Sequence, residues 1–181
     1  IARVVDFDRP FYVFSGHVDD VDAPPERWVA ATTSEHLAAV RAVQADGVYF
    51  IVGTCAGGIM AWEAARQLAH DGERVAVMLV DTPLGTTIWG ADDARRESPR
   101  AKGVAAYRAA PFSGDVTLLI SPNWSARANV EAWASFAAGS LTTIMLPPAA
   151  PNVHALQRGQ QRIIAAHLRD WIARIEGPGA A

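Results

Sequence analysis

The only cysteine of the chain, Cys55, lies within GTCAGG, residues 53–58, directly after a hydrophobic run and directly before a helical pattern. A tight turn between a buried strand and a helix lifts its middle residue above the carboxyl edge of a parallel sheet, where ligands bind. Cys55 would also lie at the positive end of the helix dipole, which favours the thiolate. Cys55 is therefore a candidate nucleophile, and the N–H of Ala56 is a candidate oxyanion donor. The alternative is a cysteine that only packs, because Cys is among the residue types most often buried.

Such a turn needs small residues around the nucleophile, because it brings backbone against backbone. Gly53, Gly57 and Gly58 meet this need. We therefore expect close packing to require all three glycines.

A thiol nucleophile needs a base, and the base needs a group that orients it. His154 lies in LPPAAPNVHAL, a predicted loop between the last strand and the last helix, and this loop opens at the same sheet edge as Cys55. His154 is our candidate base; the alternative is a surface loop histidine. The other four histidines lie in an acidic loop, within predicted helices or at a helix end: His17, His36, His167 and His70.

Two residues could orient His154. Asp81 ends the strand that follows the Cys55 helix, and Asn123 follows the next strand along the chain. Asp after a strand often caps a turn, yet Asn can also hold an imidazole tautomer. We favour Asp81 because it is charged and its strand neighbours the Cys55 turn, and we keep Asn123 as the alternative.

These candidates require an α/β fold in which strands and helices alternate, which predicts a mostly parallel sheet covered by helices on both faces. The apolar runs 48–52 and 75–80 are typical of strands buried on both faces. Residues 16–33 are rich in Asp and Pro and predict a loop, with a helix from Thr33 or Ser34 to about 46. The other expected strands are 11–14, 116–120 and 141–146, and the other expected helices are 56–70, 92–96, 102–108, 130–138 and 157–175.

The composition excludes several classes. The 181 residues carry a net charge of −3 without a basic stripe, so nothing indicates nucleic-acid binding, and no apolar run is long enough for a membrane span. A single Cys forms no internal disulfide, so the cytoplasm is the default location. We expect one domain over 1–181 and no metal site. The first residues, IARVVDFDRP, lack a Met and read as if already inside a fold, so we expect a trimmed or processed piece.

The stretch VQADGVYFIVGTCAGGIMAWEAARQLAHDGERVAVMLVDTPL, residues 43–84, resembles the type I thioesterase domains of non-ribosomal peptide and polyketide synthetases, a branch of the α/β-hydrolases. Their pattern is a G-x-S-x-G-G turn, a helix with A-x-E-x-A-x-x-L, and a strand ending in Asp. DRPFYVF upstream, and YRAAPFSGDVTLLIS and VEAWASFAAGSLTTIMLPPAAPNVHAL downstream, extend the likeness.

This resemblance implies the roles chosen above, with Cys55 as nucleophile, Asp81 as acid, His154 as base and Ala56 as oxyanion donor. It also implies that residues 85–110 form a short lid. Such domains take an acyl or peptidyl chain from the phosphopantetheine thiol of a carrier protein and release it by hydrolysis or cyclisation. They bind no cofactor of their own.

The candidates for substrate binding are Thr54, Pro83 and Trp89. Trp28 and Trp124 could line an apolar chamber together with Trp89, although aromatic residues more often belong to the core. The acyl chain itself is not indicated by the sequence.

The chain departs from the family in three ways. Cys replaces the usual Ser, and a thioester on Cys55 stays activated towards amines, so we expect an amide or strained ring as product. Residues 152–154 are Asn-Val-His where the family has Gly-x-His. The first strands, and the loop that supplies a second oxyanion N–H, have no counterpart, and losing one such donor costs a factor of about 10²–10³ in rate.

Two other functions are compatible with the turn. A glutaminase or DJ-1-like protein also presents a Cys between a strand and a helix, but it would lack the insertion between Asp81 and Val116. A degenerate domain could instead hold a carrier protein or acyl chain without turnover.

Overall fold

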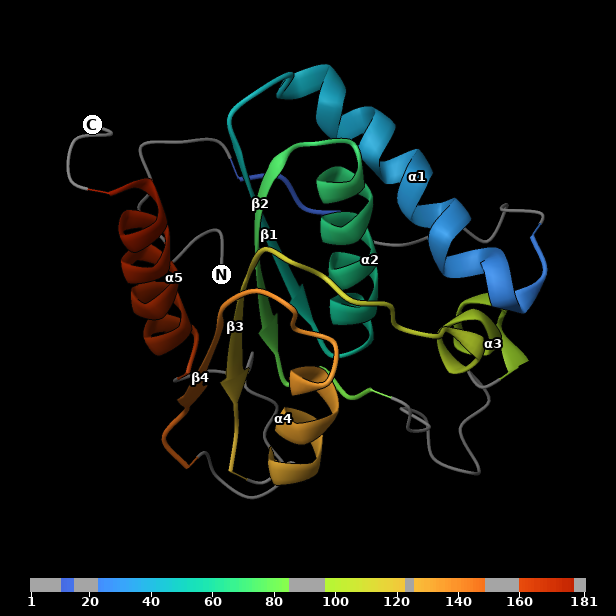
Figure 1. Cartoon of the computed structure of the whole chain (residues 1–181). Coiled ribbons are helices and arrows are strands. Elements are labelled where there is room, and N and C mark those ends of the chain that lie inside the picture. The colour runs from blue at the N-terminus through green and yellow to red at the C-terminus, as the bar shows by residue number, and fades with distance from the viewer. Residues whose placement is uncertain (1–10, 15–22, 85–96, 123–125, 149–159, 178–181) are drawn as a thin grey trace.

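The computed structural model of the chain describes residues 11–14, 23–84, 97–122, 126–148 and 160–177, and its described strands form one parallel sheet (Figure 1). The strands lie in chain order, β1-β2-β3-β4, and every neighbouring pair is parallel. Their bounds are Val48–Thr54 for β1, Arg74–Val80 for β2, Asp115–Ile120 for β3 and Leu141–Met145 for β4. The predicted α/β sheet is confirmed.

Helices cover both faces of this sheet, as predicted. The helices are α1 (Pro25–Val43), α2 (Ala56–His70), α3 (Pro99–Ala106), α4 (Ala126–Ala134) and α5 (Gln161–Glu176). In Figure 1, α5 covers one face, whereas α1, α2 and α4 lie on the other side of the sheet. Strand β2 shows why: Val75, Val77 and Leu79 belong to the core beneath α2, and the alternating Ala76, Met78 and Val80 belong to the core beneath α5.

Helix α1 begins well before the predicted start, so the prediction of a loop through residue 33 is wrong. Pro25 occupies the first helical position, where the fixed φ of proline suits a helix and its missing N–H costs no hydrogen bond. The early turns bury Trp28 and Val29, and this burial stabilises a segment that its Pro-Pro pair marks as a loop.

Residues 11–14 form no strand, contrary to the prediction, and their side chains are exposed. An isolated extended segment lacks the ladder hydrogen bonds that define a strand, and no described strand pairs with this one. The side of β1 that faces away from β2 is therefore an edge of the described sheet. Most β1 residues are only half-buried, so the prediction that 48–52 is buried on both faces is also wrong, whereas it holds for β2.

Helix α4 begins and ends four residues earlier than predicted. The residues that were expected to continue it instead run beside Phe112, whose N–H donates to the carbonyl of Phe136 and whose carbonyl accepts from the N–H of Ala138, both at 2.9 Å. The expected helix at 92–96 and the first residues of the expected helix at 157–175 lie outside the described residues.

Candidate active site

Cys55 lies on a tight turn between β1 and α2, as the sequence predicts, and the structure shows that this turn is strained. Its backbone has φ 49° and ψ −130°, a conformation that costs a non-glycine residue about 1–3 kcal/mol and persists only where the surroundings enforce it. The N–H of Cys55 donates to the carbonyl of Val80 on β2 at 3.0 Å, and the Cys55 carbonyl accepts from Gly58 at 3.0 Å. Cys55 is partly exposed. The turn therefore holds this residue at the carboxyl edge of the sheet.

Two glycines make this turn possible. A Cβ at Gly53 would lie 2.5 Å from the Cα of Gly58, and a Cβ at Gly58 would lie 1.9 Å from the Oγ1 of Thr82. Gly57 differs, because a Cβ there would meet no described atom within 4 Å. The expectation that packing requires Gly57 is therefore wrong, and its missing side chain leaves open space beside Cys55.

Ala56 is the first residue of α2 and is buried. The first N–H groups of a helix have no acceptor within the helix, and the first turn of α2 holds no acidic side chain that would offset the positive end of its dipole. The backbone at Ala56 can thus stabilise negative charge beside Cys55.

Asp81 directly follows β2 and is 2% exposed. Its Oδ1 accepts a hydrogen bond from the backbone N–H of Ser121, and its Oδ2 accepts one from the Ser121 hydroxyl, each at 2.7 Å. The Asp81 backbone also has a positive φ, 44°, and its N–H donates to the carbonyl of Leu119. The carboxylate is therefore fixed at the sheet edge that carries Cys55, since Thr54 and Val80 are paired across β1 and β2.

Ser121 was missed from the sequence. The only signal was its place directly after β3, at the sheet edge where Asp81 ends its own strand. Its neighbour by two positions, Asn123, was the alternative orienting residue and lies outside the described residues, as do His154, Trp89 and Trp124. The distance from Cys55 to His154 therefore stays a prediction.

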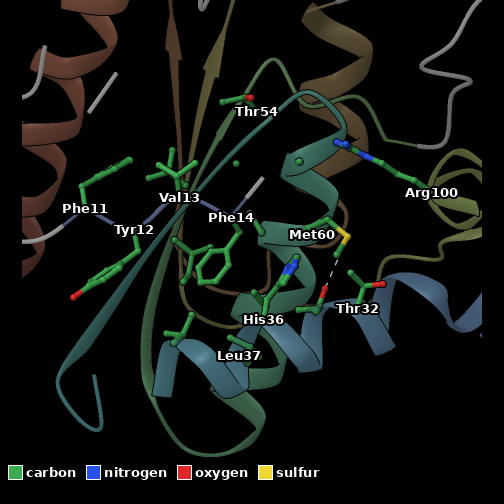
Figure 2. Close-up of a pocket in the computed structure, with 18 of the residues that line it drawn as sticks. Phe11, Tyr12, Val13, Phe14, Thr32, His36, Leu37, Thr54, Met60 and Arg100 are labelled. Carbon is green, nitrogen blue, oxygen red and sulfur yellow. Dashed lines mark hydrogen bonds between the residues drawn. The ribbon is translucent and has the colours of Figure 1, made fainter. Parts of the chain in front are cut away.

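A cavity of about 540 Å³, here called the α1 cavity, lies beside the turn, between β1, α1, α2 and residues 11–14 (Figure 2). Thr54 lines it, in agreement with its candidate role in binding, and so does Trp28. Pro83, another candidate for substrate binding, is buried. The ring of His36 lines the same cavity and stacks on Phe14 with 5.1 Å between ring centroids. Burial lowers the pKa of His36, while Glu35 opposes this shift.

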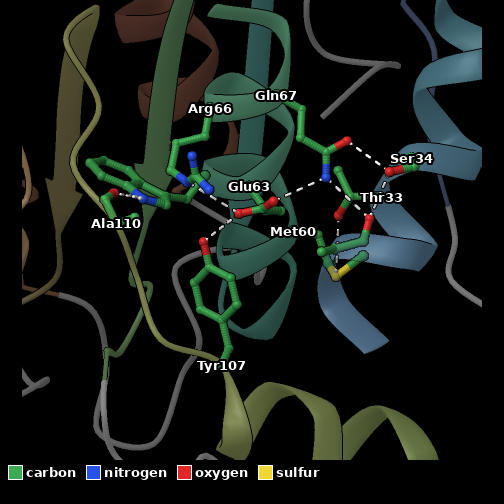
Figure 3. A network of polar contacts seen from close by, with 10 residues as sticks. Thr33, Ser34, Met60, Glu63, Arg66, Gln67, Tyr107 and Ala110 are labelled. Carbon is green, nitrogen blue, oxygen red and sulfur yellow. Dashed lines mark hydrogen bonds and ion pairs between the residues drawn. The ribbon is translucent and has the colours of Figure 1, made fainter. Parts of the chain in front are cut away.

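A buried acidic residue of α2, Glu63, forms the centre of a polar network with Arg66, Gln67 and Tyr107 (Figure 3). Its Oε2 accepts from the Tyr107 hydroxyl at 2.8 Å and lies 3.3 Å from the Arg66 Nε, and its Oε1 accepts from Gln67 at 3.0 Å. Burial and the Glu63 carboxylate raise the pKa of Tyr107 well above its usual range. This network ties the chain after α3 to the helix that carries the Cys55 turn.

Within the described ranges, no three His, Cys, Asp or Glu side chains are grouped so that they could hold a metal ion. The same part of the chain contains no helix with the length and apolar character needed to cross a membrane.

Comparison with known proteins shows which fold the chain has and which family model part of its sequence matches. Residues 18–102 match the family model of the thioesterase domain. This thioesterase match covers just under half of the chain and includes Cys55 and Asp81 but not His154. A segment of 60 residues is 38% identical to a non-reducing polyketide synthase of Cladonia metacorallifera, over 33% of this chain and 3% of that synthase. The chain thus corresponds to a small part of a very large relative.

Solved structures extend the thioesterase likeness over most of the chain. The NocB thioesterase domain, in covalent complex with a fluorophosphonate nocardicin G analogue, superimposes with a TM-score of 0.62 at 20% identity, over 85% of this chain and 78% of that one. An α/β-hydrolase family protein from Desulfitobacterium hafniense gives 0.58 at 16% identity, over 80% and 77%. The chain therefore has the α/β-hydrolase-like fold of thioesterase domains.

Proposed function

We propose that the chain is a chain-releasing thioesterase that transfers an acyl or peptidyl group from a carrier-protein thioester to Cys55. The observation that carries this proposal is the strained Cys55 turn at the sheet edge. The same edge carries Asp81, which is buried and whose carboxylate accepts two hydrogen bonds. A side chain held at positive φ is an unfavourable way to pack a cysteine, but it suits one whose sulfur must be presented.

The chemistry proceeds in two balanced steps. The Cys55 thiolate attacks the carbonyl carbon of the acyl group, and the phosphopantetheine sulfur leaves and takes the proton that the thiol gave to the base. A water molecule, or an amine of the bound chain, then attacks the new thioester. The product is an acid or a cyclic amide, and the Cys55 thiol is restored.

In this scheme the N–H of Ala56 stabilises the oxyanion, His154 moves the proton and Asp81 orients the imidazole. Residues 85–110 act as the lid, and α3 lies in its second half. The phosphopantetheine arm comes with the substrate, so the partner is a carrier protein, and the reaction takes place in the cytoplasm. The likeness to a polyketide synthase supports this partner.

The cysteine also favours a class of product. A thioester on Cys55 retains nearly the energy of the carrier thioester, so it reacts with amines more readily than an oxoester does. We expect an amide, a lactam or a small strained ring. Unchanged product and rate in the Cys55→Ser variant would contradict this expectation.

An acyl N-acetylcysteamine thioester tests the nucleophile. Intact-mass spectrometry should show one added acyl group, peptide mapping should place it on Cys55, and Cys55→Ala should remove it. His154→Ala should slow the labelling at least a hundredfold, whereas the matched variant His167→Ala should label like the parent chain. Labelling of another residue, or equal rates in the two histidine variants, would overturn the proposal.

The non-catalytic alternative predicts binding of the carrier or acyl group with no labelling in this experiment. The glutaminase or DJ-1-like alternative is disfavoured by α3, which lies in an insertion between β2 and β3 that such a protein would lack.

A further inference from the structure

The α1 cavity has an apolar body and reaches the catalytic turn. Its walls are formed mainly by aliphatic and aromatic side chains, among them Leu37, Ile51 and Met60. Its volume of about 540 Å³ lies within the roughly 300–1,000 Å³ of small-molecule sites. Gly53, Thr54 and Gly57 also line it, so the cavity extends to the residues on both sides of Cys55.

One end of the cavity carries positive charge. Arg100 on α3 lines it, is only partly exposed and pairs with no acidic group among the described residues. Figure 2 shows the Arg100 side chain extending from α3 toward the N-terminal end of α2. An arginine and the positive end of a helix dipole both favour an anion at this place.

We propose that the α1 cavity binds a fatty-acid-like ligand, with its unbranched chain among the apolar walls and its carboxylate at Arg100 and the α2 N-terminus. Resting on the proposed function, this ligand is the acid that would be released whenever water, in place of an amine, attacks the Cys55 thioester, and the cavity selects acyl groups by the length of their apolar part. Gly57 keeps the passage open, because a side chain there would project into free space.

Calorimetric titration of the Cys55→Ala chain with dodecanoate tests the site without turnover. Dodecanoate should bind at one site per chain, and the neutral analogue dodecanol should bind roughly tenfold more weakly, as expected when a charge-assisted hydrogen bond is lost. Arg100→Gln should remove this preference for the carboxylate. The matched variant Lys102→Gln should keep it, because Lys102 lies on the same helix but pairs with Glu97 and does not line the cavity.

A second variant tests the body of the cavity. Ala64 lines it from α2, so Ala64→Phe should fill its space and weaken dodecanoate binding at least tenfold while sparing butyrate. Absence of dodecanoate binding to the Cys55→Ala chain, or equal affinities in the Arg100→Gln and Lys102→Gln variants, would overturn the inference. Labelling of Cys55 without dodecanoate binding refutes only the cavity ligand, whereas binding without labelling refutes only the thioesterase.

Discussion

Ser121 holds both carboxylate oxygens of Asp81, one through its backbone N–H and one through its hydroxyl, each at 2.7 Å. Both residues are nearly inaccessible to solvent and end neighbouring strands. A buried carboxylate accepts further hydrogen bonds, so Asp81 can still receive an imidazole N–H while its position stays fixed. In this arrangement the Asp81 carboxylate is oriented by the residue that follows β3, not by its own strand alone.

Replacing Ser121 by Ala tests this arrangement. The change removes the hydroxyl donor from a buried carboxylate, so the free energy of unfolding should fall by about 1–3 kcal/mol. Urea denaturation measures the fall, and labelling of Cys55 should slow in parallel. Ser140→Ala is a suitable control, because Ser140 is exposed and its hydroxyl contacts the half-buried Asp115. Equal stability of the two variants would show that the Asp81 carboxylate does not depend on Ser121.

The glycines of the Cys55 turn should tolerate alanine very differently. Gly53→Ala and Gly58→Ala place a Cβ within 2.5 Å of other atoms and should destabilise the chain by several kcal/mol or prevent folding. Gly57→Ala meets open space and should cost about 1 kcal/mol or less. Thermal denaturation followed by circular dichroism ranks the three, and a Gly57→Ala loss as large as the others would contradict the packing described.

The backbone strain at Cys55 should be measurable as a loss of stability. Glycine adopts positive φ without steric cost, so Cys55→Gly should raise the free energy of unfolding by about 1 kcal/mol relative to Cys55→Ala, which keeps the Cβ. Both variants remove the thiol and should abolish labelling. The comparison is made by urea denaturation. If the glycine variant is the less stable of the two, the turn is not strained at this residue.

Tyr107 should make the fold sensitive to alkali. The pKa of its phenol is raised in the folded chain by burial and by Glu63, and its ordinary value is about 10. The stability that depends on the neutral phenol is therefore complete below pH 10 and is lost as the pH rises above it, because the unfolded chain ionises first.

Tyr107→Phe removes this titration. The difference in unfolding free energy between the parent chain and Tyr107→Phe should be constant below pH 9 and should shrink above pH 10. Urea denaturation over this range measures it. A difference that does not change with pH would mean that Tyr107 ionises freely in the folded state.

Much of the sheet and the turn that carries Cys55 could be predicted from the sequence because their signals are local. Apolar runs bounded by glycines marked β1 and β2, and the glycines around Cys55 marked the turn. The prediction of a strand at 11–14 failed because its apolar residues show only that the segment can be a strand. They do not show whether another strand lies beside it to pair with. The predicted start of α1 was wrong because burial of Trp28 overrides the preference of a Pro-Pro pair for a loop.

The contacts between distant elements were beyond prediction. Ser121 and Asp81 are 40 residues apart, and no pattern in either strand specifies how their ends align. At Gly57 the sequence predicted a contact that does not exist. A glycine in a tight turn indicates crowding, and only the three-dimensional surroundings of Gly57 reveal open space. The Glu63 network is similar, because Tyr107 reaches it from 44 residues away.

The outer side of β1 has a consequence for handling the isolated chain. Within the described ranges no strand pairs with this side of β1, and the neighbouring Phe11, Tyr12, Val13 and Phe14 are 39–70% exposed. A contiguous exposed apolar surface of this kind promotes aggregation. Purified material should therefore stay monodisperse only when dilute, and a charged substitution at Val13 should raise the concentration at which it begins to scatter light.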